Sequence, residues 1–166
     1  ALLGYRDEKA ARQRCASCLS QTGAREMKRQ RATIIVEIDQ RILLVENRSG
    51  LVLLPGGGIH PEESREQAAA RELTEETGLL AESLSFLFCH ESATNRHSVF
   101  RVLASGSPFA GDDAARLHFF DPDDLALTER MSAASRQIVD RFLGMRREAT
   151  AAAQSTGVVG QISPVR

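Results

Sequence analysis

One stretch of 23 residues constrains this chain more than any other: Gly57 to Leu79, with the sequence GGIHPEESREQAAARELTEETGL. Glycines open it, and a run rich in Ala, Glu, Arg and Leu, all good helix formers, follows. Pro61 suits the first turn of a helix, where its missing N–H costs nothing. Gly78 suits the left-handed residue that often closes a helix. These signals predict a helix from Pro61 to Thr77.

Three carboxylates share one face of this predicted helix. At about 100° per residue, Glu76 lies about 40° to one side of Glu72, and Glu75 lies about 60° to the other side. Like charges at this spacing disfavour a helix and raise one another's proton affinity unless a cation neutralises them. An acidic helix face is more often simply solvated. With a glycine loop directly in front, the pattern instead favours a hard divalent metal such as Mg²⁺, which takes oxygen ligands and bridges carboxylates to phosphates.

The surroundings of the carboxylates support this interpretation. Arg71 lies about 80° from Glu63 on the predicted helix, near enough for an ion pair that would steady the cluster. A strand is predicted at Leu51 to Leu54, and glycines at 56–58 let the backbone approach a ligand closely. The loop and the helix start could therefore supply carbonyls to a metal or amides to a phosphate. The core-facing stripe of the helix is predicted at Ala69, Ala70, Leu73 and Thr77.

Length and composition bound the rest of the chain. Its 166 residues, 42% of them hydrophobic, can bury one good core. The net charge of −1 implies no strong field for nucleic acid or an anionic membrane. The sequence contains no apolar run of about 18 residues, so no transmembrane helix is predicted. Three cysteines do not make a disulfide framework, so a reducing cytoplasm is the expected location.

Two of the cysteines, Cys15 and Cys18, form a single C-x2-C motif. A structural zinc site needs two further ligands, and only Cys89 and a histidine are candidates to complete one. Two free thiols in an N-terminal segment are the simpler interpretation.

Periodicity divides the chain into an N-terminal extension over 1–30, a domain over 31–145 and a C-terminal tail over 146–166. Besides the strand at 51–54, hydrophobic runs predict strands at 33–38, 42–46, 84–89, 99–104 and 117–120. Ser132 is expected to cap a last helix with a buried face of Ala134, Ile138, Phe142 and Met145. Composition predicts a weakly structured segment from Glu148 to Arg166. This order of elements indicates an α/β or α+β fold.

The spacing of the opening stretch, G-x5-E-x7-R-E-L-x-E-E-x-G-L, resembles the signature of the Nudix hydrolases. Every fixed position is filled, by Gly57, Glu63, Arg71, Glu72, Leu73, Glu75, Glu76, Gly78 and Leu79. The resemblance spans roughly residues 31–145 and implies an α/β fold of the Nudix type, an α/β/α sandwich with a mixed central sheet. Relatives often carry Glu and then Gly where this chain has His60, Pro61 and Glu62, so the loop entering the helix is expected to differ in shape. Catalytic use of His60 is less expected than a capping or exposed role.

The resemblance implies water attack on phosphorus in a nucleoside diphosphate linked to another moiety, such as an NTP, ADP-ribose or a nucleotide sugar. Mg²⁺ is the implied cofactor, and Mn²⁺ is its implied substitute. The implied metal ligands are Glu72, Glu75, Glu76 and the carbonyl of Gly57 or of Gly56. The implied catalytic residues are Glu72 as general base, Glu75 in support and Arg71 as the residue that orients the glutamates. A base from outside this stretch is the alternative, with Glu91, Asp112, Asp113 and Asp121 as candidates.

Substrate specificity in this family comes from outside the stretch. Arg96, His97 and Arg101 are weak candidates for phosphate binding, because a basic strand edge is usually just solvated. One of Phe86, Phe88, Phe100, Phe109, Phe119 and Phe120 could stack on a base, although phenylalanines in strands more often belong to the core. The expected partner is a small nucleotide derivative and neither nucleic acid nor a membrane, and the long terminal segments allow a homodimer.

Three other functions compete with hydrolysis. A nucleotide-sensing regulator of the same fold would be marked by loss of the glutamates, and none is lost. An isomerase such as isopentenyl-diphosphate isomerase would need a catalytic cysteine and a second metal cluster that the sequence does not show. A nucleic-acid-binding protein would need a basic surface, which the charge balance opposes.

Overall fold

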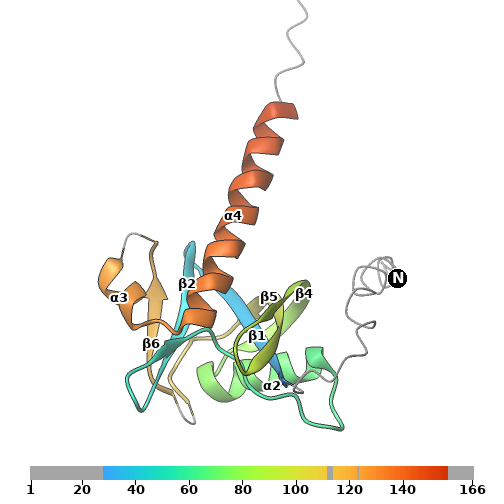
Figure 1. The fold of residues 1–166 in the computed structure, drawn as a ribbon, viewed down its shortest axis with the longest axis vertical. Coiled ribbons are helices and arrows are strands. Elements are labelled where there is room, and N and C mark those ends of the chain that lie inside the picture. The colour runs from blue at the N-terminus through green and yellow to red at the C-terminus, as the bar shows by residue number, and fades with distance from the viewer. Residues whose placement is uncertain (1–27, 112–113, 123, 157–166) are drawn as a thin grey trace, which may run out of the picture.

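The computed structural model describes residues 28–111, 114–122 and 124–156 (Figure 1). The elements of this part of the chain are, in order, β1 (Arg29–Ile38), β2 (Arg41–Asn47), β3 (Val52–Leu53), α2 (Arg65–Thr77), β4 (Leu80–Glu91), β5 (Asn95–Ser105), β6 (Ala114–Phe120), α3 (Leu125–Arg130) and α4 (Ala133–Thr156). None of the helices described is long and apolar enough to cross a membrane.

The strands form one mixed sheet in the order β3-β2-β1-β5-β4, with β6 paired to β2. β1 and β2 form an antiparallel hairpin through Asp39 and Gln40, both of which have positive φ. β1 runs parallel to β5, and β5 runs antiparallel to β4. The central strand therefore has a parallel and an antiparallel neighbour, which confirms the predicted mixed sheet.

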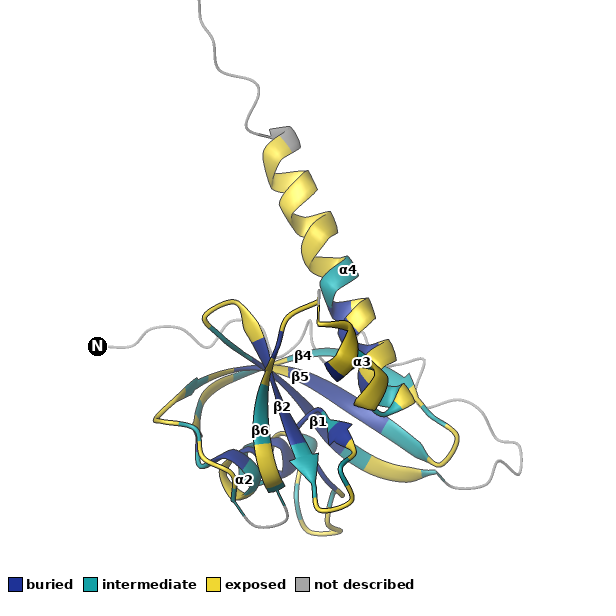
Figure 2. Cartoon of the chain, turned by 90° about the vertical axis from the view of Figure 1, so that its left-hand side faces the viewer, coloured by how far each residue is buried: buried dark blue, intermediate teal, exposed yellow. Residues whose placement is uncertain are grey.

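A hydrophobic core lies on each face of the sheet, because successive side chains of β1 point to opposite sides. Ile34 and Val36 pack with residues of α2, whereas Ile35 packs with residues of α3 and α4. Figure 2 shows α2 and α4 on opposite sides of the buried strands. Two helical layers around one sheet make the predicted α/β/α sandwich.

α2 begins at Arg65, so the predicted start at Pro61 is wrong. Ser64 caps the helix: its Oγ accepts from the Gln67 N–H at 3.1 Å, and Gln67 Oε1 accepts from the Ser64 N–H at 2.7 Å. This reciprocal pair satisfies two N–H groups that Pro61 could not serve. Gly78 ends the helix with φ 68°, as predicted. The buried residues of α2 are Ala68, Ala69, Leu73 and Thr77, so Ala68 is buried where the sequence predicted Ala70.

All six predicted strands are present, most of them longer than predicted. β1 begins at Arg29, within the segment assigned to the N-terminal extension. The other predictions for that extension, including those for Cys15 and Cys18, concern residues outside the described ranges. The division of the chain into three parts stays a prediction.

The C-terminal helices differ most from the prediction. α3 was not predicted, and Asp124 caps it by accepting from the Leu127 N–H at 3.0 Å. α4 continues to Thr156, so the expectation of weak structure is wrong from Glu148 to Thr156, where alanines favour a helix that is already formed. Met145 is 39% exposed rather than buried, because α4 leaves the core after Phe142.

Candidate active site

The glycine loop runs alongside β1 as if it were another strand. The Ile34 N–H donates to the Pro55 carbonyl at 2.9 Å, and the Ala32 N–H donates to the Gly57 carbonyl at 3.0 Å. Gly56 has φ 140°, and a Cβ there would lie 2.2 Å from the Ala32 carbonyl oxygen. Only glycine fits this position, so the sequence fixes the path of the loop against the sheet.

Two of the predicted carboxylates lie against this loop. The Gly56 N–H donates to Glu76 Oε2 at 2.9 Å. A Cβ on Gly57 would lie 2.0 Å from Glu72 Oε1, so the second glycine makes room for that side chain. Both glutamates are half-buried. The sequence therefore correctly predicted that the loop and the acidic helix face meet.

Arg71 gathers the carboxylates through its guanidinium group. It binds Glu63 with two hydrogen bonds, Nη2 to Oε1 at 2.7 Å and Nε to Oε2 at 3.1 Å. Its Nη1 donates to Glu72 at 2.8 Å and to Glu75 at 2.9 Å, and its Nη2 also donates to the Gly58 carbonyl at 3.0 Å. The predicted ion pair with Glu63 is confirmed, although Glu63 lies in the turn before α2 rather than on the helix.

This network keeps Glu63 charged. The hydrogen bonds from Arg71, together with the His60 N–H at 2.8 Å from Oε1, lower the pKa of Glu63 to about 2. The carboxylates in turn raise the pKa of Arg71 above its ordinary value, Glu63 most of all. Glu63 is thus committed to Arg71 and serves to position it. The backbone of His60 contributes to the network, and its exposed ring lies 3.7 Å from Glu63.

The donor set fits a hard divalent cation, although the side chains are not gathered around one point. Arg71 holds Glu72 and Glu75 while Gly56 holds Glu76, and the described residues contain no ready group of three metal-ligating side chains. Arg71 occupies only one oxygen each of Glu72 and Glu75. Carboxylate and carbonyl oxygens are the kind of ligand that Mg²⁺ prefers.

The weaker candidates from the sequence lie elsewhere in the sheet. Arg101 forms an ion pair with Glu37 at 3.1 Å, near the far end of β1 from the loop. Arg96 lies opposite Gln30 and Glu91 in the sheet, and Glu91 pairs with Lys28 at 3.1 Å. Asp121 is exposed after β6, whereas Asp112 and Asp113 lie outside the described residues.

The phenylalanines are mostly structural. Phe88, Phe100 and Phe120 are buried in the two cores, and Phe86 packs edge-on against Phe100 at 5.6 Å between ring centroids. Phe109 covers Gly78 at the end of α2, and its N–H donates to the Thr77 carbonyl at 2.9 Å.

The sequence missed a second guanidinium at the loop. Arg31 Nη2 donates to the Gly56 carbonyl at 2.6 Å. Beside it on the same face, His97 is buried and its Nδ1 lies 2.9 Å from Thr33 Oγ1. Burial, with the charge of Arg31 as a lesser cause, lowers the pKa of His97 to about 4, so it is neutral at pH 7. Only the approach of the loop to β1 reveals this contact, and no local pattern signals it.

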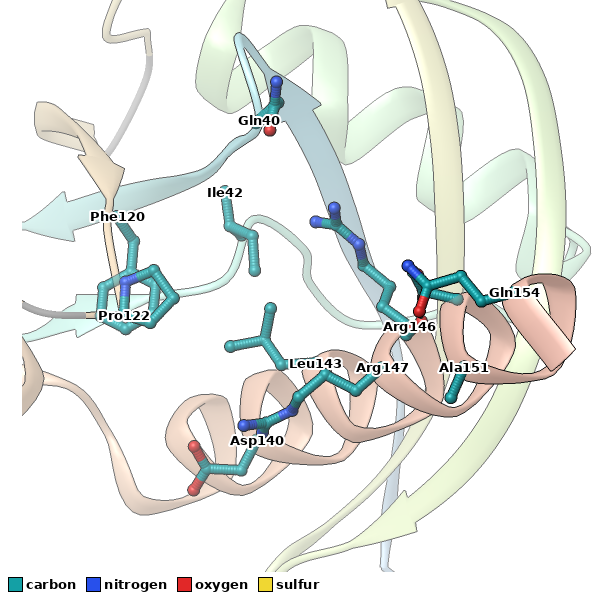
Figure 3. Close-up of a pocket in the computed structure, with 11 residues that line it drawn as sticks. Gln40, Ile42, Phe120, Pro122, Asp140, Leu143, Arg146, Arg147, Ala151 and Gln154 are labelled. Atoms are coloured by element: carbon teal, nitrogen blue, oxygen red, sulfur yellow. Dashed lines mark hydrogen bonds between the residues drawn. The ribbon is translucent and has the colours of Figure 1, made fainter.

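A cavity of about 610 Å³ lies apart from the carboxylates, between α4 and the ends of β2 and β6 (Figure 3). Ile42 and Leu143 face each other across it, and Phe120 and Pro122 form one wall. None of the glutamates of α2 lines this cavity, because α2 and α4 pack on opposite faces of the sheet.

Comparisons with known proteins agree with this geometry. A model of the NUDIX domain matches residues 27–142. An ADP-ribose pyrophosphatase of Methanocaldococcus jannaschii is 35% identical over 102 residues, which are 55% of this chain and 60% of that protein. A candidate 8-oxo-dGTP diphosphatase of Bacillus subtilis is 34% identical over 99 residues, 57% of this chain and 66% of that protein. The matches thus span less than two thirds of the length of both relatives.

The fold has close solved counterparts. The crystal structure of a candidate Nudix hydrolase family member from Chromobacterium violaceum is 30% identical, with a TM-score of 0.67 over 80% of this chain and 92% of that chain. The family model covers well over half of the present sequence. The chain belongs to the Nudix family.

Proposed function

We propose that this chain is a Mg²⁺-dependent pyrophosphohydrolase that cleaves a diphosphate bond in a nucleoside diphosphate linked to another moiety. One observation carries the proposal: Arg71 holds Glu72 and Glu75, and the glycine loop holds Glu76, all three on one helix next to the loop. Three crowded carboxylates disfavour the helix that bears them.

The residues would divide the work as follows. Glu72 and Glu76 would hold the metal, with Glu75 and a carbonyl of Gly56 or Gly57 in support. Once bound, Mg²⁺ supplies neutralisation of the charge that develops on phosphoryl oxygens. Glu72 would also serve as the general base for the attacking water, and Arg71 donates to its Oε1. Arg71 would keep Glu72 and Glu75 oriented.

The names of the two curated relatives support the substrate class. One is named for ADP-ribose and the other for 8-oxo-dGTP. Both compounds contain a nucleoside diphosphate unit, and they differ in what is attached to it. We therefore propose a substrate with this unit and leave the attached group to experiment.

The test is turnover with Mg²⁺, measured by chromatographic separation of the nucleotide products, on NTPs, oxidised dNTPs, ADP-ribose, NADH, nucleotide sugars and dinucleoside polyphosphates. It compares the wild type with Glu76→Gln and with Glu66→Gln, a control on an exposed position in the first turn of α2. We expect turnover of one class by the wild type and the control, and its loss in Glu76→Gln or with EDTA.

Two outcomes would contradict the proposal. Turnover that survives both EDTA and Glu76→Gln would place the chemistry elsewhere. Tight nucleotide binding without any turnover would instead support a nucleotide-sensing regulator on the same fold.

A further inference from the structure

Within the part of the chain that the structure describes, Arg31 and Arg71 both contact the glycine loop, and they differ in how many carboxylates neutralise their charge. Arg71 donates to three carboxylates as well as to the Gly58 carbonyl. Arg31 is half-buried. Within the described residues, its guanidinium donates only to the Gly56 carbonyl, at 2.6 Å. An arginine has five N–H donors. Most donors of Arg31 are therefore unused within the described structure.

The charge of Arg31 is also uncompensated there. No carboxylate of the described residues forms an ion pair with it. The neighbour of Arg31 across the sheet is His97, which is buried and neutral at pH 7. Removing a charge from water without a partner costs free energy. A half-buried guanidinium in this state is suited to bind an anion.

The position of Arg31 relates that anion to the carboxylates. Gly56 joins the two: its N–H donates to Glu76 and its carbonyl accepts from Arg31. Both hydrogen bonds involve the backbone of this single residue, so they lie close together. Side chains alternate along β1, so Arg31 lies on the face of the sheet opposite α2. A ligand that reaches from Glu76 to Arg31 must cross the loop at Gly56.

We propose that Arg31 binds an oxygen of the substrate's diphosphate bridge, on the side of Gly56 away from Glu76. A guanidinium can keep one N–H on a carbonyl while two others grip a phosphoryl group. One phosphoryl group would then meet the metal held by the glutamates, and the next would meet Arg31. This inference rests on the proposed function and adds a substrate-binding residue to it.

The test measures binding of Mg²⁺-imidodiphosphate by titration calorimetry. This probe has a P–N–P bridge in place of P–O–P and carries no base, so the result does not depend on which nucleoside the enzyme prefers. The variants are Arg31→Gln, Arg31→Lys and the control Arg116→Gln, which alters an exposed arginine on β6 of the same sheet. Thermal unfolding of each variant is measured in parallel.

We expect Arg31→Gln to weaken binding about 10- to 100-fold, the range for a lost charge-assisted hydrogen bond. Arg31→Lys should fall between Arg31→Gln and the wild type, because lysine keeps the charge without the fork. Arg116→Gln should bind as the wild type does. With the substrate found by turnover, Arg31→Gln should raise KM more than it lowers kcat.

Equal imidodiphosphate affinity in the wild type and Arg31→Gln would overturn the inference. A lower unfolding temperature with unchanged affinity would do the same, because it would show that Arg31 only holds the loop. These outcomes differ from failure of the proposed function, in which the wild type hydrolyses no nucleotide whatever Arg31 does.

Discussion

The two long helices of the sandwich bury different kinds of residue. α2 buries small side chains, Ala68 and Ala69 beside Leu73, so its backbone comes close to the sheet and to the glycine loop. α4 buries Ile138 and Phe142, and its outer turns extend into solvent (Figure 2). Because α2 lies close to the glycine loop, its carboxylates lie beside Gly56 and Gly57. The large side chains of α4 instead fill the core on the other face of the sheet. We infer that α2 carries the chemistry and α4 carries stability.

The largest expected effect tests the α4 side of this comparison. Phe142→Ala should lower the free energy of unfolding by about 3–5 kcal/mol, because a buried ring leaves a cavity. The folded fraction should keep its turnover. Urea unfolding measures the loss, and Met145→Ala, on the exposed part of the same helix, should change stability by less than about 1 kcal/mol. Equal losses in the two variants would break the comparison.

The second prediction concerns the α2 side. Glu72→Gln should lower turnover about 100-fold or more, which corresponds to about 2.7 kcal/mol in the activation barrier. The free energy of unfolding should change by less than about 1 kcal/mol, because Arg71 keeps Glu63 and Glu75 as partners. Steady-state kinetics and urea unfolding on the same preparation separate the two quantities. A loss of stability as large as that of Phe142→Ala would show that the carboxylates are structural.

The third prediction concerns how stability depends on pH through His97, a buried residue of the sheet between the two helices. The pKa of His97 is about 4 in the folded state, against an ordinary value of 6.5. Between these values the unfolded chain takes up a proton that the folded chain does not, so stability should fall as pH drops from about 6.5 to about 4. Above pH 6.5 this contribution should be constant.

Urea unfolding of the wild type and His97→Gln over that pH range tests this. The free energy of unfolding should fall more steeply on acidification in the wild type than in the variant. The difference in slope should correspond to the uptake of at most one proton on unfolding. The difference between the two proteins isolates His97 from His90, whose pKa is also lowered by burial. Identical slopes would contradict burial of a neutral His97.

The smallest expected effect concerns the start of α2. Ser64→Ala should cost about 1 kcal/mol of stability, because it removes the acceptor for the Gln67 N–H. Thermal unfolding measures it, with Ser85→Ala, an exposed strand position, as control. Turnover should hardly change, since the carboxylates lie two turns further along. A large loss of turnover would mean that the loop before the helix shares in the chemistry.

The sequence predicted the parts of the site that depend on local geometry. Carboxylates on one helix keep fixed angles to one another, so their shared face followed from spacing alone. The start of α2 was missed because Pro61 and Ser64 are both plausible helix-start residues, and a reciprocal bond with Gln67 decides between them. Arg31 was missed because its contact with Gly56 joins residues 25 positions apart. Such a contact depends on how the loop packs against β1.

The length of α4 shows a different limit. Its last turns are polar and alanine-rich, a composition shared by weakly structured segments and by exposed helices. What distinguishes them is the packed helix that precedes them, since extending a formed helix avoids the cost of nucleation. The same cause explains Met145, which follows the helical period but lies beyond the edge of the core.

The central claim is that the α2 carboxylates bind a divalent metal, and Mn²⁺ titration followed by electron paramagnetic resonance tests it without any substrate. The proteins to compare are the wild type, Glu76→Gln and the control Glu66→Gln. We predict saturable binding that Glu76→Gln weakens about 10-fold or more and that Glu66→Gln leaves unchanged. Equal Mn²⁺ affinity in all three proteins would contradict the account.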